Sequence, residues 1–140
     1  MTTQMSYQIG DTLPEIVTPA IDRMRIAYMT VSMRDPNLVH LEDDYAAKAG
    51  LPSVIAHGTF AVSHLGAAVS RAVGVDALTQ FRVDLVAPVF PGDVLRTEAT
   101  VTGVETGDGG TVVSVKLSAT KADGTRVARG TAAFREPAAA

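Results

Sequence analysis

Residues 58–74 read GTFAVSHLGAAVSRAVG and form the most apolar helix-like segment of the chain. The segment contains one Lys or Arg, Arg71, and no carboxylate, so the helix that it predicts has almost no polar face. Gly74 is expected to stop this helix, which we place over Gly58–Val73. Because a helix that is apolar nearly all round belongs in the interior of a protein, the segment predicts one long central helix.

The sequence after this helix changes to the period of a β-strand, with apolar side chains at alternate positions. This alternation predicts four strands, which are centred on Phe81–Leu85, Leu95–Val101, Val113–Ala119 and Thr125–Phe134. The expected turns between them are Pro91-Gly92-Asp93, Thr106–Gly110 and Asp123-Gly124. Such strands bury one face of an antiparallel sheet and leave the other face in water. The expected fold class is therefore α+β, with an antiparallel sheet wrapped against one buried helix.

The sequence before the central helix predicts shorter elements. Asp22 is expected to cap a helix that runs to about Val31 and points three side chains toward the core, those of Ile26, Met29 and Met33. The other expected elements are an irregular or edge strand over Glu15–Ile21, a loop over Arg34–Leu41, and a short helix over Asp43–Ala49 capped by Gly50. We expect a single domain over residues 1–140, with a disordered tail from about residue 136 to residue 140.

The composition excludes several classes of protein. The 12 Lys and Arg residues are outnumbered by 15 Asp and Glu residues and form no basic stripe, which argues against a nucleic-acid binder. The chain has no Cys, so disulfides and thiolate chemistry are excluded, and a cytoplasmic location is expected. The first residues lack the pattern of a signal peptide, and polar residues interrupt the most apolar run, so no membrane partner is expected.

The candidate chemistry lies just before the central helix. Asp35 and His40 are five positions apart in the predicted loop, and an acid and a histidine can hold one water between them. His57 and Gly58 open the central helix, whose first backbone N–H groups can bind a developing oxyanion. Together these features suggest the addition of water to an activated double bond, or its removal. From spacing alone, a turn-forming Asp and a surface His are the better interpretation.

The flanking motifs reverse that preference, because the chain resembles the MaoC-like dehydratases, also called R-specific enoyl-CoA hydratases or hydratase 2. Residues 34–40, Arg-Asp-Pro-Asn-Leu-Val-His, are similar to the family motif Gly-Asp-x-Asn-Pro-(Leu/Ile/Val)-His. Residues 55–58 match Ile-Ala-His-Gly, and residues 87–93 match Ala-Pro-Val-x-Pro-Gly-Asp. Two positions depart from the motif, since its Gly is Arg34 here and its Pro is Leu38. The resemblance implies the hot-dog fold, a curved antiparallel sheet wrapped around one long central helix.

The resemblance also implies an activity, the R-specific hydration of trans-2-enoyl thioesters to (3R)-3-hydroxyacyl thioesters, or the reverse dehydration. Asp35 and His40 would be the joint acid and base, Gly58 the oxyanion donor, and Asn37 and His57 supporting residues. Coenzyme A or acyl carrier protein would enter as part of the substrate, with no other cofactor. No metal is expected, because the acids and histidines show no ligand spacing. A homodimer or a higher even oligomer is expected.

Two other interpretations stay open. A hot-dog acyl-CoA thioesterase commonly carries a carboxylate on or near the central helix, and Gly58–Val73 has none. A subunit of a heteromeric hydratase usually lacks the Asp/His pair, which this chain keeps, although Arg34 and Leu38 depart from the motif. The acyl chain length, its branching, the thioester carrier and the physiological direction are open at this stage.

Overall fold

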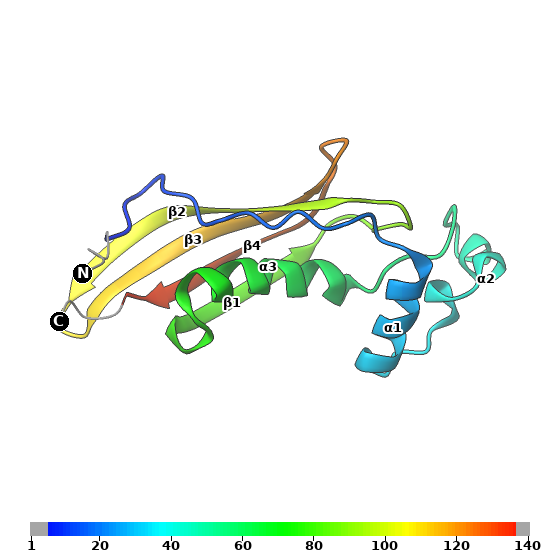
Figure 1. Ribbon diagram of the computed structural model, residues 1–140, viewed down its shortest axis with the longest axis horizontal. Coiled ribbons are helices and arrows are strands. Elements are labelled where there is room, and N and C mark those ends of the chain that lie inside the picture. Colours follow the sequence, from blue (N-terminus) through cyan, green and yellow to red (C-terminus); the bar gives the residue numbers. More distant parts are fainter. Residues whose placement is uncertain (1–5, 137–140) are drawn as a thin grey trace.

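Four antiparallel strands form one curved sheet, and a single long helix packs against one of its faces (Figure 1). This architecture is seen in a computed structural model that describes residues 6–136. The strands lie in the order β1-β4-β3-β2, and their bounds are Leu78–Leu85 for β1, Leu95–Gly107 for β2, Gly110–Lys121 for β3 and Arg126–Arg135 for β4. The predicted α+β fold class is confirmed.

Helix α3 spans Gly58–Val73, as its apolar sequence predicts. One face of the helix lies against the sheet and buries five side chains, those of Phe60, Ala61, Leu65, Ala68 and Val69. The opposite face is covered less, since Ser63 is exposed and Val62 and Ala67 are only half-buried. The sheet therefore covers one side of the helix and does not surround it.

The inward side chains of the central strand β3 are completely buried; these are Val113, Val115, Leu117 and Ala119. The alternation that predicted this strand thus identifies its core-facing side correctly. The predicted turn over Thr106–Gly110 is too long, because β2 continues to Gly107 and β3 begins at Gly110. At Gly130 on β4, a Cβ atom would collide with the backbone oxygen of Arg82, so glycine lets β1 approach β4 closely.

The segments before α3 agree with the sequence in part. Helix α1 spans Arg23–Met33, and the Asp22 carboxylate accepts a hydrogen bond from the Arg25 N–H at 2.7 Å, so the predicted cap is confirmed. Ile26 is fully buried, but Met33 is 45% exposed because the last turn of α1 extends beyond the core. The remaining elements are a 3₁₀ turn, η1, over Leu38–His40, helix α2 over Asp43–Lys48, and a second 3₁₀ turn, η2, over Val75–Ala77.

Residues 15–21 form no strand, contrary to the sequence prediction. The N-terminal segment instead runs along the edge of β2 and makes only isolated bridges, Thr12 with Thr100 and Val17 with Arg96. Its backbone N–H groups donate to β2 carbonyls, for example from Leu13 to Ala99 at 2.9 Å. Pro19 has no N–H to donate, and this favours an irregular path over a regular ladder. The segment thereby covers one edge of the sheet and leaves β1 as the open edge of the described chain.

The two ends of the described chain meet. The Glu136 carboxylate accepts hydrogen bonds from the Tyr7 N–H at 2.7 Å and from the Ser6 hydroxyl at 3.2 Å. The predicted tail from about residue 136 therefore has its first residue paired, and the rest of that tail lies outside the described residues. No helix within residues 6–136 is long and apolar enough to cross a membrane.

Arg34 adopts a backbone conformation that only glycine and a few other residues favour. It follows α1 with φ 51° and ψ 39°, and its N–H donates to the carbonyls of Thr30 and Val31. It is the only residue other than glycine with positive φ in the described chain. A glycine suits this position at the end of a helix, which gives a structural reason for the glycine that the family motif has here.

We expect Arg34→Gly to raise the free energy of unfolding by about 0.5–1 kcal/mol. The left-handed conformation costs a residue with a Cβ roughly 1–2 kcal/mol, and the greater freedom of glycine in the unfolded chain offsets part of that gain. Urea unfolding of both proteins measures the difference. Arg34→Ala is the control, because alanine keeps the Cβ and should bring no gain. A loss of stability in Arg34→Gly would contradict the account.

Candidate active site

Asp35, His40 and His57 converge on one point between α1 and the start of α3. His40 Nε2 lies 3.6 Å from Asp35 Oδ2, and His57 Nε2 lies 3.9 Å from the same oxygen. The two imidazoles are buried, whereas the Asp35 side chain is 50% exposed. A carboxylate that reaches solvent thus stands beside two imidazoles that are held in place by protein. The predicted supporting residue His57 joins the Asp/His pair directly.

The residue that orients His40 is Ile55, through its main chain. The Ile55 carbonyl lies 2.7 Å from His40 Nδ1, and the Ile55 N–H donates to the Val39 carbonyl at 3.2 Å. A carbonyl can only accept, so Nδ1 carries the proton of the neutral ring. Nε2 then presents a lone pair toward Asp35. Sequence reasoning did not identify this contact, because backbone groups leave no signal in residue types.

His57 stacks on His40, with ring centroids 3.7 Å apart and ring planes 22° apart. Its Nε2 lies 3.3 Å from the Asp35 carbonyl, while its Nδ1 is buried without a hydrogen-bond partner in the described chain. Burial, and then the neighbouring His40, lower the pKa of the His57 imidazole, although the Asp35 carbonyl and carboxylate oppose this shift. His57 is therefore neutral at physiological pH, because its burial disfavours the charged imidazole.

Asn37 braces the loop between Asp35 and His40. Its side-chain oxygen accepts a hydrogen bond from the Val39 N–H at 3.1 Å and caps η1. Its own N–H donates to Asp35 Oδ1 at 3.4 Å. These contacts join the acid to the turn that carries His40. Asn37 thus acts on the shape of the loop, and its supporting role in catalysis stays a prediction.

Asp43 connects the small helices that carry the site. Its carboxylate pairs with Arg23 of α1 at 2.9 Å and accepts a hydrogen bond from the Val54 N–H at 3.0 Å. The hydrogen bonds from Arg23 and then from Val54 lower the pKa of Asp43, so it stays ionised. One residue of α2 therefore ties α1 to the segment that leads into α3. Its residue type alone did not distinguish it from other surface acids.

Gly58 lies next to His57, at the first turn of α3. The backbone N–H groups of Gly58 and Thr59 have no backbone acceptor within residues 6–136. This is the normal state of the first turn of a helix, and such groups attract negative charge. The His57 side chain does not cap them. The predicted donor is thus free to bind an oxyanion close to the Asp/His pair.

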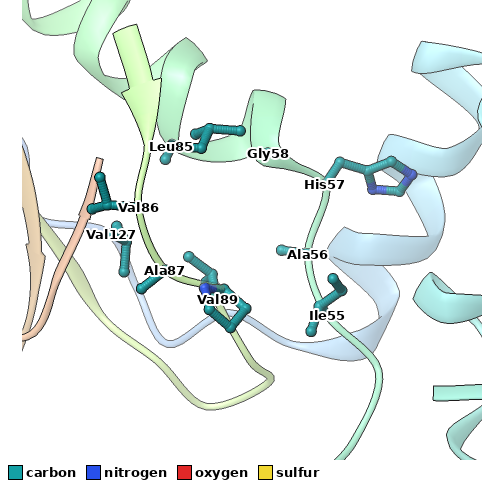
Figure 2. Close-up of a pocket in the computed structure, with 11 residues that line it drawn as sticks. Ile55, Ala56, His57, Gly58, Leu85, Val86, Ala87, Val89 and Val127 are labelled. Carbon is teal, nitrogen blue, oxygen red and sulfur yellow. The ribbon is translucent and has the colours of Figure 1, made fainter. Parts of the chain in front are cut away.

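An apolar pocket of about 360 Å³ opens beside this helix start (Figure 2). Its walls are two segments joined by a hydrogen bond from the Ala56 N–H to the Val89 carbonyl at 2.8 Å. The lining residues are Ile55–Gly58 and Ala61 on one side, and Leu85–Val89 and Val127 on the other. His57 belongs to the lining, but its ring points away from the other labelled side chains in Figure 2. The pocket therefore adjoins the Asp/His pair at His57 and Gly58.

The sequence located only part of this pocket. The motif at residues 87–93 supplies Ala87 and Val89, whereas the wall formed by Leu85 and Val86 was not anticipated. The available signal was the run Leu85-Val86-Ala87, where three apolar residues interrupt the alternation of β1. The third histidine, His64, lies in mid-helix with its Nδ1 2.7 Å from the Phe60 carbonyl.

The fold brings together three side chains that could in principle hold a metal ion, Asp35, His40 and His57. Spacing along the chain gave no sign of this cluster, because the fold alone makes these residues neighbours. The ring geometry does not suit one ion. Rings stacked 3.7 Å apart send their lone pairs out side by side, whereas an ion about 2.0–2.1 Å from both nitrogens must lie in both ring planes. We keep the expectation of a site that works without metal.

Comparisons with known proteins agree with this fold. The family model of the MaoC like domain matches residues 9–123. A search of curated proteins finds no match. The chain is similar to a solved structure of the (R)-hydratase from A. caviae involved in PHA biosynthesis, with 19% identity and a TM-score of 0.81, over 94% of this chain and 98% of that chain.

Two further solved structures are similar to the chain. R-hydratase PhaJ1 from Pseudomonas aeruginosa shares 23% identity at a TM-score of 0.79, over 94% of this chain and 83% of that chain. A chain of the ChsH1-ChsH2 complex from Mycobacterium tuberculosis shares 20% identity at a TM-score of 0.80, over 94% of this chain and 100% of that chain. At these identities the likeness establishes the fold.

We expect His57 to make the protein less stable at acidic pH. The free energy of unfolding should decrease as the pH is lowered below the usual histidine pKa of 6.5. The folded pKa of His57 is lowered, so the unfolded chain binds more protons between that pKa and 6.5. The contribution of neutral His57 to the free energy of unfolding is complete above pH 6.5. It is lost as the pH falls through the pKa that His57 has in the folded protein. Urea unfolding of the wild type and of His57→Gln across this range measures it. Equal slopes in the two proteins would contradict the prediction.

Proposed function

Because this chain belongs to the MaoC-like domain family, we propose that it hydrates trans-2-enoyl thioesters to (3R)-3-hydroxyacyl thioesters, or catalyses the reverse dehydration. One observation carries the proposal. The Asp35 carboxylate stands 3.6 Å from His40 Nε2, beside a helix start with free N–H groups. Acid, base and oxyanion donor are the three groups that addition of water to a conjugated thioester needs. Fatty acid metabolism in the cytoplasm is the proposed setting.

The pair acts on one water. Ionised Asp35 and neutral His40 Nε2 are both acceptors, so a single water can donate a hydrogen to each. As its oxygen bonds to C3 of the enoyl group, the pair takes one proton from the water. The same proton is returned to C2, where the electrons of the double bond collect. Both new bonds form on the face of the substrate that meets the pair, which makes the addition syn.

Gly58 meets the charge that builds up on the thioester oxygen. Attack at C3 converts the thioester carbonyl to an enolate, and a backbone N–H at the first turn of a helix points a fixed dipole at that oxygen. A donor of this kind is worth on the order of 3 kcal/mol of barrier. His57 contacts the Asp35 carbonyl through its Nε2 and stacks on one face of the His40 ring, so it positions the Asp/His pair. Asn37 supports the loop between them.

The carrier of the acyl group is part of the substrate. Coenzyme A or acyl carrier protein would present the thioester, and the apolar pocket beside Gly58 would take the acyl chain. The proposal needs no further cofactor and no metal ion. Activity of the purified protein should accordingly be the same before and after treatment with a chelator.

A single assay separates this function from its alternatives. Purified protein is mixed with trans-2-enoyl-CoA, and two signals are followed together. Loss of the conjugated thioester absorbance indicates hydration, whereas release of free thiol indicates a thioesterase. A thioesterase is less favoured because α3 has no carboxylate. The absence of both signals would indicate a heteromeric enzyme that requires a different partner chain, or another acyl group.

We also propose that two copies pair through β1. The N-terminal segment hydrogen-bonds along β2, so β1 is the edge of the sheet that is left open within residues 6–136. An open edge offers a row of N–H and C=O groups to another strand. Antiparallel pairing of β1 with its copy would extend the sheet across a two-fold axis, the commonest symmetry of soluble homo-oligomers. Both α3 helices would then lie on the same side of the joined sheet.

Asp35→Asn and His40→Ala should each lower kcat by about 100-fold or more, the scale expected for a positioned acid or base. Their combined effect should be less than the product of the two, because both residues act on one water. The rate is followed by the absorbance of the best enoyl-CoA substrate. Thermal unfolding checks that the variants are folded.

Asp76→Asn and His64→Ala are matched controls for these two variants. They make the same kind of change at an acid and a histidine that lie outside the proposed site, and they should keep normal turnover. If Asp35→Asn and His40→Ala also keep near-normal turnover, Asp35 and His40 are not the acid and base.

Sedimentation of the purified protein should give twice the mass of one chain. Dilution below the dimer affinity should remove activity before it removes the far-ultraviolet circular dichroism, provided that residues of both copies line the acyl site. A stable and active monomer would reject the dimer. Co-purification of a different chain in equal amount would point to the heteromeric alternative instead.

A further inference from the structure

Leu85 reaches from the end of β1 to the start of α3. It is the last residue of the strand, where it pairs with Ala128 of β4. Figure 2 shows its side chain extended toward Gly58. If Gly58 carried a Cβ, that atom would collide with Leu85 Cδ1, and the three atoms nearest to it would all belong to Leu85. A methyl group of Leu85 therefore rests against the Gly58 backbone.

Both residues line the same apolar pocket, so the contact lies inside it and not behind its wall. Leu85 is nevertheless 53% exposed and belongs to no part of the buried core. Two other residues of the lining differ from it, because Ala56 and Val89 are buried and the Ala56 N–H donates a hydrogen bond to the Val89 carbonyl. Leu85 is thus a large side chain that can be shortened without removing core packing.

The proposed oxyanion geometry brings the substrate to this contact. A thioester oxygen bound to the Gly58 N–H lies about 2.9 Å from that nitrogen. One C=O bond and one C–C bond further, C2 of the acyl chain lies within about 5 Å of the same nitrogen. Because a Leu85 methyl touches the Gly58 backbone, a substituent on C2 that faces this side of the pocket meets Leu85.

We infer that Leu85 is the residue that selects the acyl group at C2, admitting straight-chain 2-enoyl thioesters and rejecting those with a methyl branch at C2. This inference rests on the proposed function. It names a substrate class for the site, unbranched next to the thioester. It also explains the glycine at position 58, since any larger residue would compete with Leu85 for the same space.

The first test compares trans-2-butenoyl-CoA with 2-methyl-2-butenoyl-CoA as substrates. One methyl group in an apolar pocket changes kcat/KM by about 10-fold to 200-fold. The wild type should prefer the straight chain by a factor in this range, and Leu85→Ala should lower that preference about tenfold or more. Leu85→Met is the matched control, because it keeps the side-chain volume and should keep the preference.

The second test does not depend on turnover. Butyryl-CoA and 2-methylbutyryl-CoA cannot be hydrated, and calorimetry can measure how tightly each binds. Leu85→Ala should gain affinity for the branched ligand relative to the straight one. Thermal unfolding then tests the contact itself, since Gly58→Ala should lower the Tm of the wild type but not that of Leu85→Ala.

The outcomes separate this inference from the proposed function. Hydration of butenoyl-CoA with an unchanged preference in Leu85→Ala overturns the inference and leaves the function standing. An equal fall in Tm on Gly58→Ala in both backgrounds overturns it as well, because Leu85 would not occupy that space. A wild type that neither hydrates the enoyl-CoA substrates nor binds their saturated analogues overturns the proposed function and, with it, the choice of acyl group. The inference is supported if Leu85→Ala loses the preference for the straight-chain substrate and if Gly58→Ala lowers the Tm of the wild type but not that of Leu85→Ala.

Discussion

The packing of α3 against the curved sheet is the contact on which the rest of the molecule depends. Phe60, Leu65 and Val69 face the sheet from successive turns of the helix and meet the fully buried side chains of β3. Burial of this kind stabilises by roughly 25 cal/mol for each Å² of apolar surface removed from water. The helix start is thereby fixed, and with it the positions of His57 and Gly58. A site at the end of such a helix inherits the rigidity of the core.

The chemistry lies where that rigid helix meets three short segments. Backbone hydrogen bonds, and not the residue types alone, decide how they meet. The Ile55 carbonyl orients the His40 ring, and Asp43 ties α1 to the residues before α3. His57 contributes twice, by stacking on His40 and by contacting the Asp35 carbonyl. Of Asp35, His40 and His57, only Asp35 reaches solvent, so the polar end of the site opens outward while the pocket beside it stays apolar.

Two surfaces of the described chain are left uncovered. The outer side of α3 is only half covered, and β1 has no neighbour on its outer edge within the described chain. The first follows from a sheet that covers only one side of an apolar helix, and the second from the place of β1 at the end of the strand order. The pocket wall at Leu85 and Val86 stands at the end of that open strand. The two proposals, acyl recognition and subunit pairing, thus place both roles on one strand.

Local patterns were sufficient to predict the regular elements. The apolar run defined α3 to the residue, and alternation identified the inward side of β3, because periodicity directly reflects which side of an element is buried. Two predictions were wrong, the core position of Met33 and the strand over residues 15–21. The end of a helix and an irregular sheet edge depend on what lies next to them, which a local pattern does not contain. The resemblance to the family motifs identified Asp35, His40 and Gly58 as candidates.

Tertiary structure alone decided how these residues are placed relative to one another. Chain separation carries no information on whether His57 stacks on His40, because long-range contacts depend on how the whole core packs. The same holds for the Ile55 carbonyl, which every residue type possesses, and for the contact between Leu85 and Gly58 across the pocket. The amino-acid pattern determined which segments become helix or strand and which face they bury. The packing of those segments determined the distances between the side chains of the site and the pocket wall that a substrate would contact.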